Sequence, residues 1–131
     1  MMVGPPPYTL LVVEDEPSIR FAMREYFGAK GWQVTTAASS GEAREVLAAK
    51  EVDVAILDLR LGIDDRDGGL VLAEWIFTSY PKARTILLTG YGSEATRDRA
   101  REAGVAEVLD KPMRLRELCA LASRLVEDRP R

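Results

Sequence analysis

Three carboxylates follow directly after short apolar segments of the sequence. Glu14 and Asp15 come after TLLVV (9–13), and Asp58 comes after VAIL (54–57). Carboxylates gathered within a few ångströms repel one another, and burial would raise the pKa of at least one of them. A divalent cation would relieve that repulsion, and an all-oxygen site with few protein ligands suits Mg²⁺ better than Ca²⁺. We therefore expect these residues to form a Mg²⁺ site, which Mn²⁺ could also occupy.

A hydroxyl and an ammonium group stand at the ends of two other apolar segments. Thr89 closes TILLT (85–89), and Lys111 follows AEVL (106–109) after one intervening residue. Taken singly, Thr is a common strand residue and Lys is most often a solvated surface charge. Together with the carboxylates, however, the two donors favour a site for a phosphoryl group that is attached to, or in contact with, a carboxylate.

The composition of the 131-residue chain argues against several other classes of function. The sequence has no histidine, so it offers no Ser–His or Cys–His nucleophile, no histidine-containing metal site and no phosphohistidine of its own. The net charge of −3 gives no support for nucleic-acid binding. No apolar run approaches the roughly 18 residues that span a bilayer, and the first residues do not resemble a secretory signal. We expect one cytoplasmic domain, which fits the single Cys119, without direct contact to nucleic acid or membrane.

Five short apolar segments alternate with five longer periodic ones, and these are the elements that must position the site. The short segments are mostly apolar at successive positions, which is typical of parallel strands buried on both faces. The predicted strands are 9–13, 33–37, 54–57, 85–89 and 106–109, with the more polar 33–37 at an edge. The predicted helices lie between Pro17 and Gly31, from the Ser39–Glu42 capping box through Leu47, between Leu70 and Pro81, from Ser93 to Ala103 and from Leu115 to Val126.

This alternation predicts an α/β fold with an open, doubly wound (βα)5 parallel sheet. The functional site of such a sheet lies beyond the carboxyl ends of its strands, which is where the five side chains above would meet. Residues 1–8, with three consecutive prolines, are predicted to form an exposed arm, and residues 9–131 the domain.

Two of the predicted helices differ from the others in their apolar content. The helix 93–103 has only small apolar anchors, namely Ala95, Ala100 and Ala103, so its rearrangement should cost little free energy. The helix 115–126 carries extra apolar residues, namely Cys119, Leu121 and Val126. This excess is the basis of a hypothesis that the helix takes part in a homodimer.

At four places the sequence resembles the receiver (phospho-acceptor) domain of two-component response regulators, the chemotaxis regulators among them. The motifs that carry the resemblance are LLVVEDEPSIR, VDVAILDLRL, TILLTGYG and GVAEVLDKP, which occur in the family's order and spacing over residues 9–127. The resemblance implies a flavodoxin-like sheet with the strand order 2-1-3-4-5. It also implies a phospho-acceptor that turns over no outside substrate, although it catalyses its own phosphorylation and slow dephosphorylation.

The resemblance also implies a role for each site residue. Asp58 would attack a phosphohistidine of a sensor histidine kinase, or of a histidine phosphotransfer protein, and become an aspartyl phosphate. Asp15 would bind Mg²⁺ directly and Glu14 through water, with the backbone carbonyl of Arg60 and Asp58 itself as further ligands. The metal would neutralise charge that otherwise keeps an anionic carboxylate from attacking an anionic phosphoryl group.

Thr89 and Lys111 would contact the phosphoryl oxygens, and Thr89 would move inward after phosphorylation. The face made by the fourth helix, fifth strand and fifth helix would then repack and change its protein contacts, including those of a homodimer. Where the family often has an aromatic switch residue this chain has Val108, although Tyr91 lies close to Thr89 in sequence. The Lys111–Pro112 peptide bond is predicted to be cis, as is typical of the family.

Three alternatives remain open at the sequence level. The chain could be a receiver-like binding module that works without phosphorylation, although such a module has no need for all five site residues. It could also be a fragment of a larger regulator or of a hybrid kinase. A metal-dependent hydrolase is disfavoured because Arg60, and no second carboxylate, stands two residues after Asp58. The loop after Asp58 is about three residues longer than is common in the family.

Overall fold

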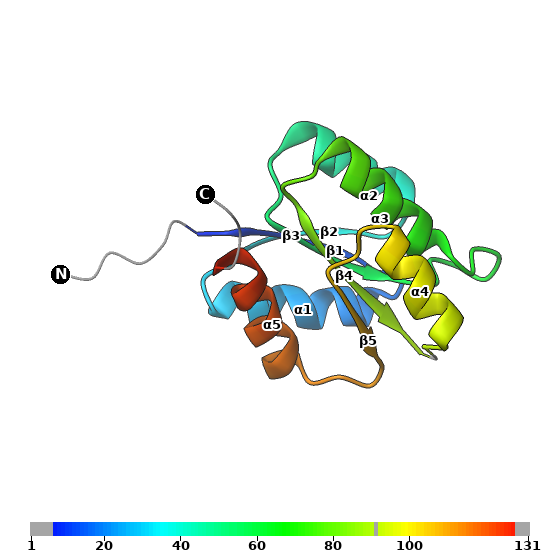
Figure 1. Ribbon diagram of the computed structural model, residues 1–131. Coiled ribbons are helices and arrows are strands. Elements are labelled where there is room, and N and C mark those ends of the chain that lie inside the picture. The colour runs from blue at the N-terminus through cyan, green and yellow to red at the C-terminus, as the bar shows by residue number, and fades with distance from the viewer. Residues whose placement is uncertain (1–6, 91, 128–131) are drawn as a thin grey trace.

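The structure is a computed structural model, and it describes residues 7–90 and 92–127. Strands and helices alternate along the chain as β1 (Thr9–Val13), α1 (Pro17–Ala29), β2 (Gln33–Ala37), α2 (Ser40–Ala49), β3 (Val54–Asp58), α3 (Gly68–Ser79), β4 (Arg84–Thr89), α4 (Glu94–Glu102), β5 (Glu107–Asp110) and α5 (Leu115–Glu127). The strands form one parallel sheet in the order β2-β1-β3-β4-β5, with α1 and α5 on one face and α2, α3 and α4 on the other (Figure 1). The predicted doubly wound fold, its strand order and the edge position of β2 are confirmed.

The sheet divides the hydrophobic core into two clusters, because successive strand residues point to opposite faces. In β1, Leu11 and Val13 pack under α2 and α3, whereas Leu10 and Val12 pack under α1 and α5. Every residue of β3 is buried, including its last residue, Asp58. Burial on both faces explains why β3 has no polar residue before Asp58, at its carboxyl end.

The observed element boundaries lie close to the predicted ones, with small shifts that bear on the site. β3 continues through Asp58, so the carboxylate belongs to the strand and not to the loop after it.

The capping box at α2 forms in a modified way. The Ser39 hydroxyl accepts from the Glu42 N–H, but the Glu42 carboxylate accepts from the N–H of Ala38, one residue before the cap.

Two predictions about the helices are wrong. Ala95 is exposed because it lies in the first turn of α4, away from the sheet, and only Ala100 and Ala103 anchor that helix. The extra apolar residues of α5, Cys119, Leu121 and Val126, are buried within the chain itself. They pack in the same cluster as Leu10 and Val12, so they do not form an exposed apolar face, and the homodimer itself stays a prediction.

The predicted arm over residues 1–8 lies mostly outside the described residues. Of its last two residues, Pro7 is exposed, and Tyr8 is half-buried with its ring 5.8 Å from that of Trp32. Within the two described segments of the chain, no helix has both the length and the apolar character to cross a membrane.

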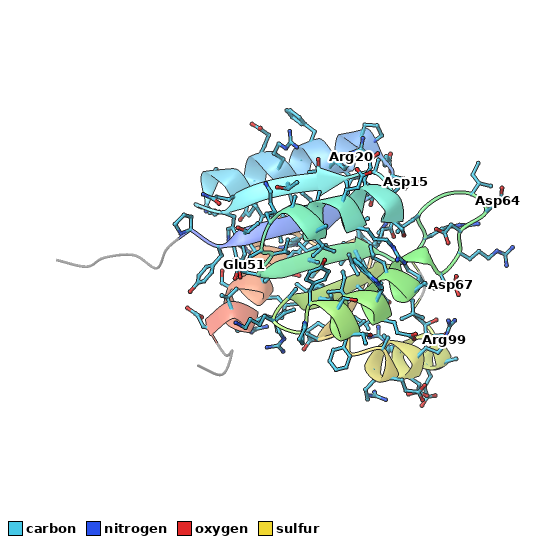
Figure 2. The ribbon with its side chains drawn as sticks, turned by 90° about the horizontal axis from the view of Figure 1, so that it is seen from above. Asp15, Arg20, Glu51, Asp64, Asp67 and Arg99 are labelled. Carbon is cyan, nitrogen blue, oxygen red and sulfur yellow. The ribbon has the colours of Figure 1, made fainter. Side chains whose placement is uncertain are left out.

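The loop between β3 and α3 returns closely to its starting point. The Gly69 N–H donates to the carbonyl of Leu59 at 2.9 Å, which closes the base of the loop. A Cβ at Gly69 would overlap the carbonyl oxygen of Asp58, so this position needs glycine because the two backbones touch. The intervening residues, Asp64 and Asp67 among them, extend past the same end of the sheet as Asp15, opposite to Glu51 (Figure 2).

Gly69→Ala should lower the free energy of unfolding by about 1–3 kcal/mol, because backbone atoms of β3 or α3 must move to admit the methyl group. Urea denaturation of the purified protein measures the change. Gly28→Ala in α1 is the matched control, since a Cβ there meets nothing within 4 Å, and it should stabilise by about 0.5–1 kcal/mol. Equal stability of the Gly69 variant and the wild type would contradict the close contact.

Candidate phosphoryl and metal site

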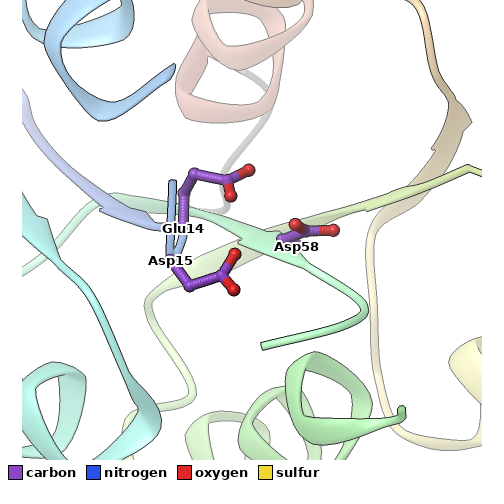
Figure 3. Close-up of side chains that lie close together, drawn as sticks. All are labelled: Glu14, Asp15 and Asp58. Atoms are coloured by element: carbon purple, nitrogen blue, oxygen red, sulfur yellow. The ribbon is translucent and has the colours of Figure 1, made fainter. Parts of the chain in front are cut away.

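The structure brings the three predicted carboxylates together at the carboxyl ends of β1 and β3. One oxygen from each of Glu14, Asp15 and Asp58 lies within 4.8 Å of the others, and the three groups point toward a common space (Figure 3). Glu14 and Asp58 are 3% and 8% exposed, whereas Asp15 is exposed. Such a cluster has both buried ligands and an open side from which a small ion can enter.

Backbone contacts fix the position of Glu14 just past the end of β1. Its N–H continues the pairing with β2 by donating to the carbonyl of Ala37 at 3.0 Å. The Arg20 guanidinium of α1 donates to the Glu14 carbonyl at 2.7 Å, and the Glu14 carboxylate accepts from the N–H of Glu16 at 3.0 Å. The side chain is thus turned back under the first turn of α1 and held against Asp58.

Lys111 provides a cation in direct contact with the buried carboxylates. Its Nζ lies 3.1 Å from Oδ2 of Asp58 and 3.7 Å from Oε1 of Glu14. The Lys111 N–H donates to the carbonyl of Thr89 at 2.8 Å, so the lysine and the threonine are held in register by the pairing of β5 with β4. The predicted cis peptide bond between Lys111 and Pro112 is confirmed.

Glu14 is the carboxylate most affected by this crowding. Its pKa is raised from 4.5 to about 7, first because burial disfavours the charged form and then because Asp58 is negatively charged. The N–H of Glu16 opposes this shift, and so does Lys111 to a smaller extent. One lysine therefore does not neutralise the cluster, and a divalent cation would relieve the remaining repulsion. Carboxylate oxygens are the donors that a hard cation prefers, so the donor set fits Mg²⁺.

The site opens into a hollow of about 790 Å³ at the end of the sheet. Thr89 is 2% exposed at its floor, and Arg60 lines it from the loop after β3. The hollow is lined by Glu14, Asp15, Glu16, Asp58, Leu59, Arg60, Gly62, Ile63, Arg66, Thr89, Gly90 and Lys111. All of the predicted site residues are therefore in one place. Tyr91, considered from the sequence as a neighbouring aromatic, lies outside the described residues.

Two arginines at this site were not predicted from the sequence. Arg20 holds the carbonyl of Glu14, and Arg66 lines the hollow from the far part of the loop between β3 and α3. Arg20 lies six residues from Glu14, and only knowledge of how α1 starts could have linked them. Arg66 could not be placed because the path of a long loop does not follow from residue periodicity.

Comparison with known proteins identifies relatives along nearly the whole chain. A profile of the response regulator receiver domain matches residues 10–123. The response regulator protein PilR of Pseudomonas aeruginosa is 39% identical over 119 residues, which cover 88% of this chain and 26% of PilR. The TorCAD operon transcriptional regulatory protein TorR of Escherichia coli is 30% identical over 120 residues, which cover 92% of this chain and 50% of TorR. This chain thus spans a quarter to a half of the length of these relatives.

Solved structures agree with the sequence comparison. A CheY-like receiver domain protein from Methanospirillum hungatei superposes with a TM-score of 0.84 at 24% identity, covering 92% of this chain and 95% of that one. This likeness concerns the fold. A response regulator from Burkholderia pseudomallei, crystallised with a phosphorylated aspartic acid, a calcium ion and citrate, has a TM-score of 0.79 at 28% identity and covers 92% of this chain and 72% of that one.

The resemblance inferred from the four motifs is confirmed by these matches. The profile match extends from β1 into α5, and so includes every strand of the sheet and each residue of the acidic cluster. The chain therefore belongs to the receiver domain family of two-component response regulators.

Proposed function

We propose that this domain accepts a phosphoryl group on Asp58 from the phosphohistidine of a sensor histidine kinase or a histidine phosphotransfer protein. The observation that carries the proposal is the contact of the Asp58 carboxylate with Lys111 at 3.1 Å, beside the carboxylates of Glu14 and Asp15. An Asp58 oxygen would form the new P–O bond while the P–N bond to imidazole breaks, and the imidazole leaves as the neutral group after taking up a proton. Response regulators in general receive phosphoryl groups from histidine kinases, and receiver domains are generally signalling domains rather than enzymes.

Mg²⁺ would be held by Asp15 and Asp58, by Glu14 directly or through water, and by the backbone carbonyl of Arg60. Its chemistry in such a site is to neutralise charge on the attacking carboxylate and on the phosphoryl oxygens. The raised pKa of Glu14 and the three converging carboxylates support this assignment. The Burkholderia structure, which contains both a phosphorylated aspartic acid and a calcium ion, supports it from a relative.

Lys111 and Thr89 would contact the phosphoryl group once it is on Asp58. The Lys111 ammonium already lies beside the proposed acceptor carboxylate, so a phosphoryl group on Asp58 would form next to it. The Thr89 hydroxyl comes from the neighbouring strand, one residue beyond Leu88, which is the register partner of Asp58. Both groups are donors, and hydrogen bonds to an anionic oxygen are about twice as strong as those between neutral groups.

Phosphorylation would be read out through α4, β5 and α5. Among the residues described, only Ala100 within α4 is buried, so few apolar contacts oppose a shift of this helix. Arg97 holds α4 to β5 by an ion pair with Asp110 at 2.7 Å and by a hydrogen bond to the carbonyl of Val108 at 3.2 Å. Asp110 directly precedes Lys111, so this clamp joins the proposed signalling face to the acceptor site.

The chain matches only part of PilR and TorR, so the assignment concerns the receiver activity alone. The cytoplasmic location and a homodimer through α4, β5 and α5 stay predictions. A receiver-like module that works without phosphorylation is the outcome if the acceptor test below fails.

Asp58→Asn should abolish phosphorylation, because an amide oxygen is not a nucleophile toward phosphorus at neutral pH. The protein is incubated with acetyl phosphate and Mg²⁺, and intact-mass spectrometry looks for the addition of one phosphoryl group. The wild type should gain the mass of one phosphoryl group and lose that mass over time once acetyl phosphate is removed. Chelation of Mg²⁺ should prevent the addition. Modification that persists in the Asp58→Asn variant at an unchanged rate would refute Asp58 as the acceptor.

Glu14→Gln should raise the free energy of unfolding of the metal-free protein above pH 7 and weaken Mg²⁺ binding. The pKa of Glu14 is higher in the folded protein than its ordinary 4.5. Below pH 4.5 the side chain is mostly uncharged in both the folded and the unfolded protein, so its ionisation does not lower the free energy of unfolding there. The cost grows as the pH rises to about 7, and it then amounts to roughly 3 kcal/mol.

Denaturation with urea across this pH range measures the difference between the variant and the wild type. A constant difference between Glu14→Gln and the wild type at every pH would contradict the raised pKa of Glu14.

Arg97→Ala should speed amide hydrogen exchange in α4 about fivefold, because the clamp to β5 contributes about 1 kcal/mol to its closed state. Exchange in β1 and β3 should stay as in the wild type. Arg101→Ala is the matched control, since that arginine pairs with Asp98 within α4 itself and is exposed. Equal amide exchange rates in α4 of Arg97→Ala and Arg101→Ala would contradict the role of Arg97 in holding α4.

A further inference from the structure

The charges that line the hollow are nearly balanced. Four carboxylates line it, from Glu14, Asp15, Glu16 and Asp58, together with three cations, from Arg60, Arg66 and Lys111. A bound divalent cation would turn the net charge of this lining from −1 to +1. The hollow can then attract a phosphate anion, provided that a cationic side chain is exposed at its mouth.

Lys111 is not the cation that faces outward. Its ammonium is engaged with two buried carboxylates, at 3.1 and 3.7 Å. The backbone carbonyl of Arg60 is a proposed metal ligand, so a change at that residue would disturb the metal as well. Arg66 is therefore the residue whose charge can be tested by itself.

Arg66 is exposed, and it has neither a hydrogen bond nor an ion pair with any described residue. The acidic residue beside it, Asp67, is already paired with Arg99 of α4 at 3.3 Å. Asp64 shares with Arg66 the lining of a second, smaller hollow next to the first, without forming an ion pair with it. The guanidinium is thus available to an incoming ligand.

The backbone of the loop explains how a residue so far from Asp58 in sequence returns to the hollow. The Leu61 N–H donates to the Asp65 carbonyl at 3.0 Å, and the Asp65 N–H donates to the Gly62 carbonyl at 3.3 Å. Gly62 has φ +138°, a conformation that glycine adopts readily and other residues rarely do. This turn brings Arg66 back to the hollow, which Ile63 of the same loop also lines.

We infer that Arg66 is a phosphate-binding residue, which contacts the oxygens of a small anionic phosphodonor, such as an acyl phosphate, at the mouth of the hollow. A guanidinium suits this task because its planar fork can bind two phosphate oxygens at once. The donor would be held between Arg66 and the metal side of the site, with its phosphorus near Asp58. The inference rests on the proposed function for the transfer step but not for the binding step.

Binding is tested first, with inorganic phosphate as the probe and without any transfer. The Mg²⁺-loaded wild type and Arg66→Ala are titrated with phosphate, while ¹⁵N NMR follows the Arg66 Nε–H signal and the amide of Gly90. The wild type should show saturable shifts at both positions, and Arg66→Ala should bind several-fold more weakly at Gly90. Arg124→Ala is the charge-matched control, because Arg124 is exposed in the last turn of α5. Equal binding by Arg66→Ala and Arg124→Ala, or an Arg66 signal that does not shift, would overturn the inference.

The rate of phosphorylation by acetyl phosphate is the second measurement. Arg66→Ala should lower the rate constant several-fold at low salt, Arg66→Lys should lower it less, and Arg124→Ala should leave it unchanged. The difference should shrink in ~0.5 M salt, where charge attraction is screened, whereas a structural defect would persist. A wild type that binds phosphate through Arg66 but is never phosphorylated would refute the proposed function and leave this inference standing. If the wild type and Arg66→Ala are phosphorylated at the same rate, the proposed function stands and this inference is refuted.

Discussion

The close packing of negative charge at the carboxyl ends of β1 and β3 is the constraint on which the other features of this domain depend. Three carboxylates within 4.8 Å of one another repel, and two of them are buried. The free energy to hold them there comes from the apolar strands beneath, where Leu10–Val13 and Val54–Leu57 are buried on both faces. The site is thus an unfavourable charge cluster kept in place by a favourable core.

Lys111 offsets this repulsion only partly, and the position of the lysine depends on the pairing of β5 with β4. The strand that Lys111 directly follows is also the strand that Arg97 joins to α4. Electrostatics at the acceptor and packing at the proposed signalling face therefore meet in one short edge strand. A change of charge at Asp58 would act on Lys111 through their ion pair, and Asp110, the residue before Lys111, is paired with Arg97 of α4.

Most of the fold could be predicted from the sequence, because strands buried on both faces are distinctive and the helices between them have clear starts and stops. The convergence of Glu14, Asp15, Asp58, Thr89 and Lys111 also followed, since parallel strands end at the same side of a sheet. The errors arose where a residue's neighbours decide its burial. Ala95 was expected to anchor α4 but faces solvent, and the apolar residues of α5 fill their own core. Arg66 was missed because its place depends on a turn at Gly62 that periodicity does not specify.

The hydrogen bond from the Gly69 N–H to the Leu59 carbonyl joins the two ends of the loop after β3, whatever residues lie between them. Residues can therefore be inserted, deleted or exchanged in that segment while the acceptor strand and the start of α3 stay where they are. In the proposed function, the residues that accept the phosphoryl group and the residue that binds its donor would therefore lie on separate parts of the backbone. Evolution, or an engineer, can alter the second while keeping the first.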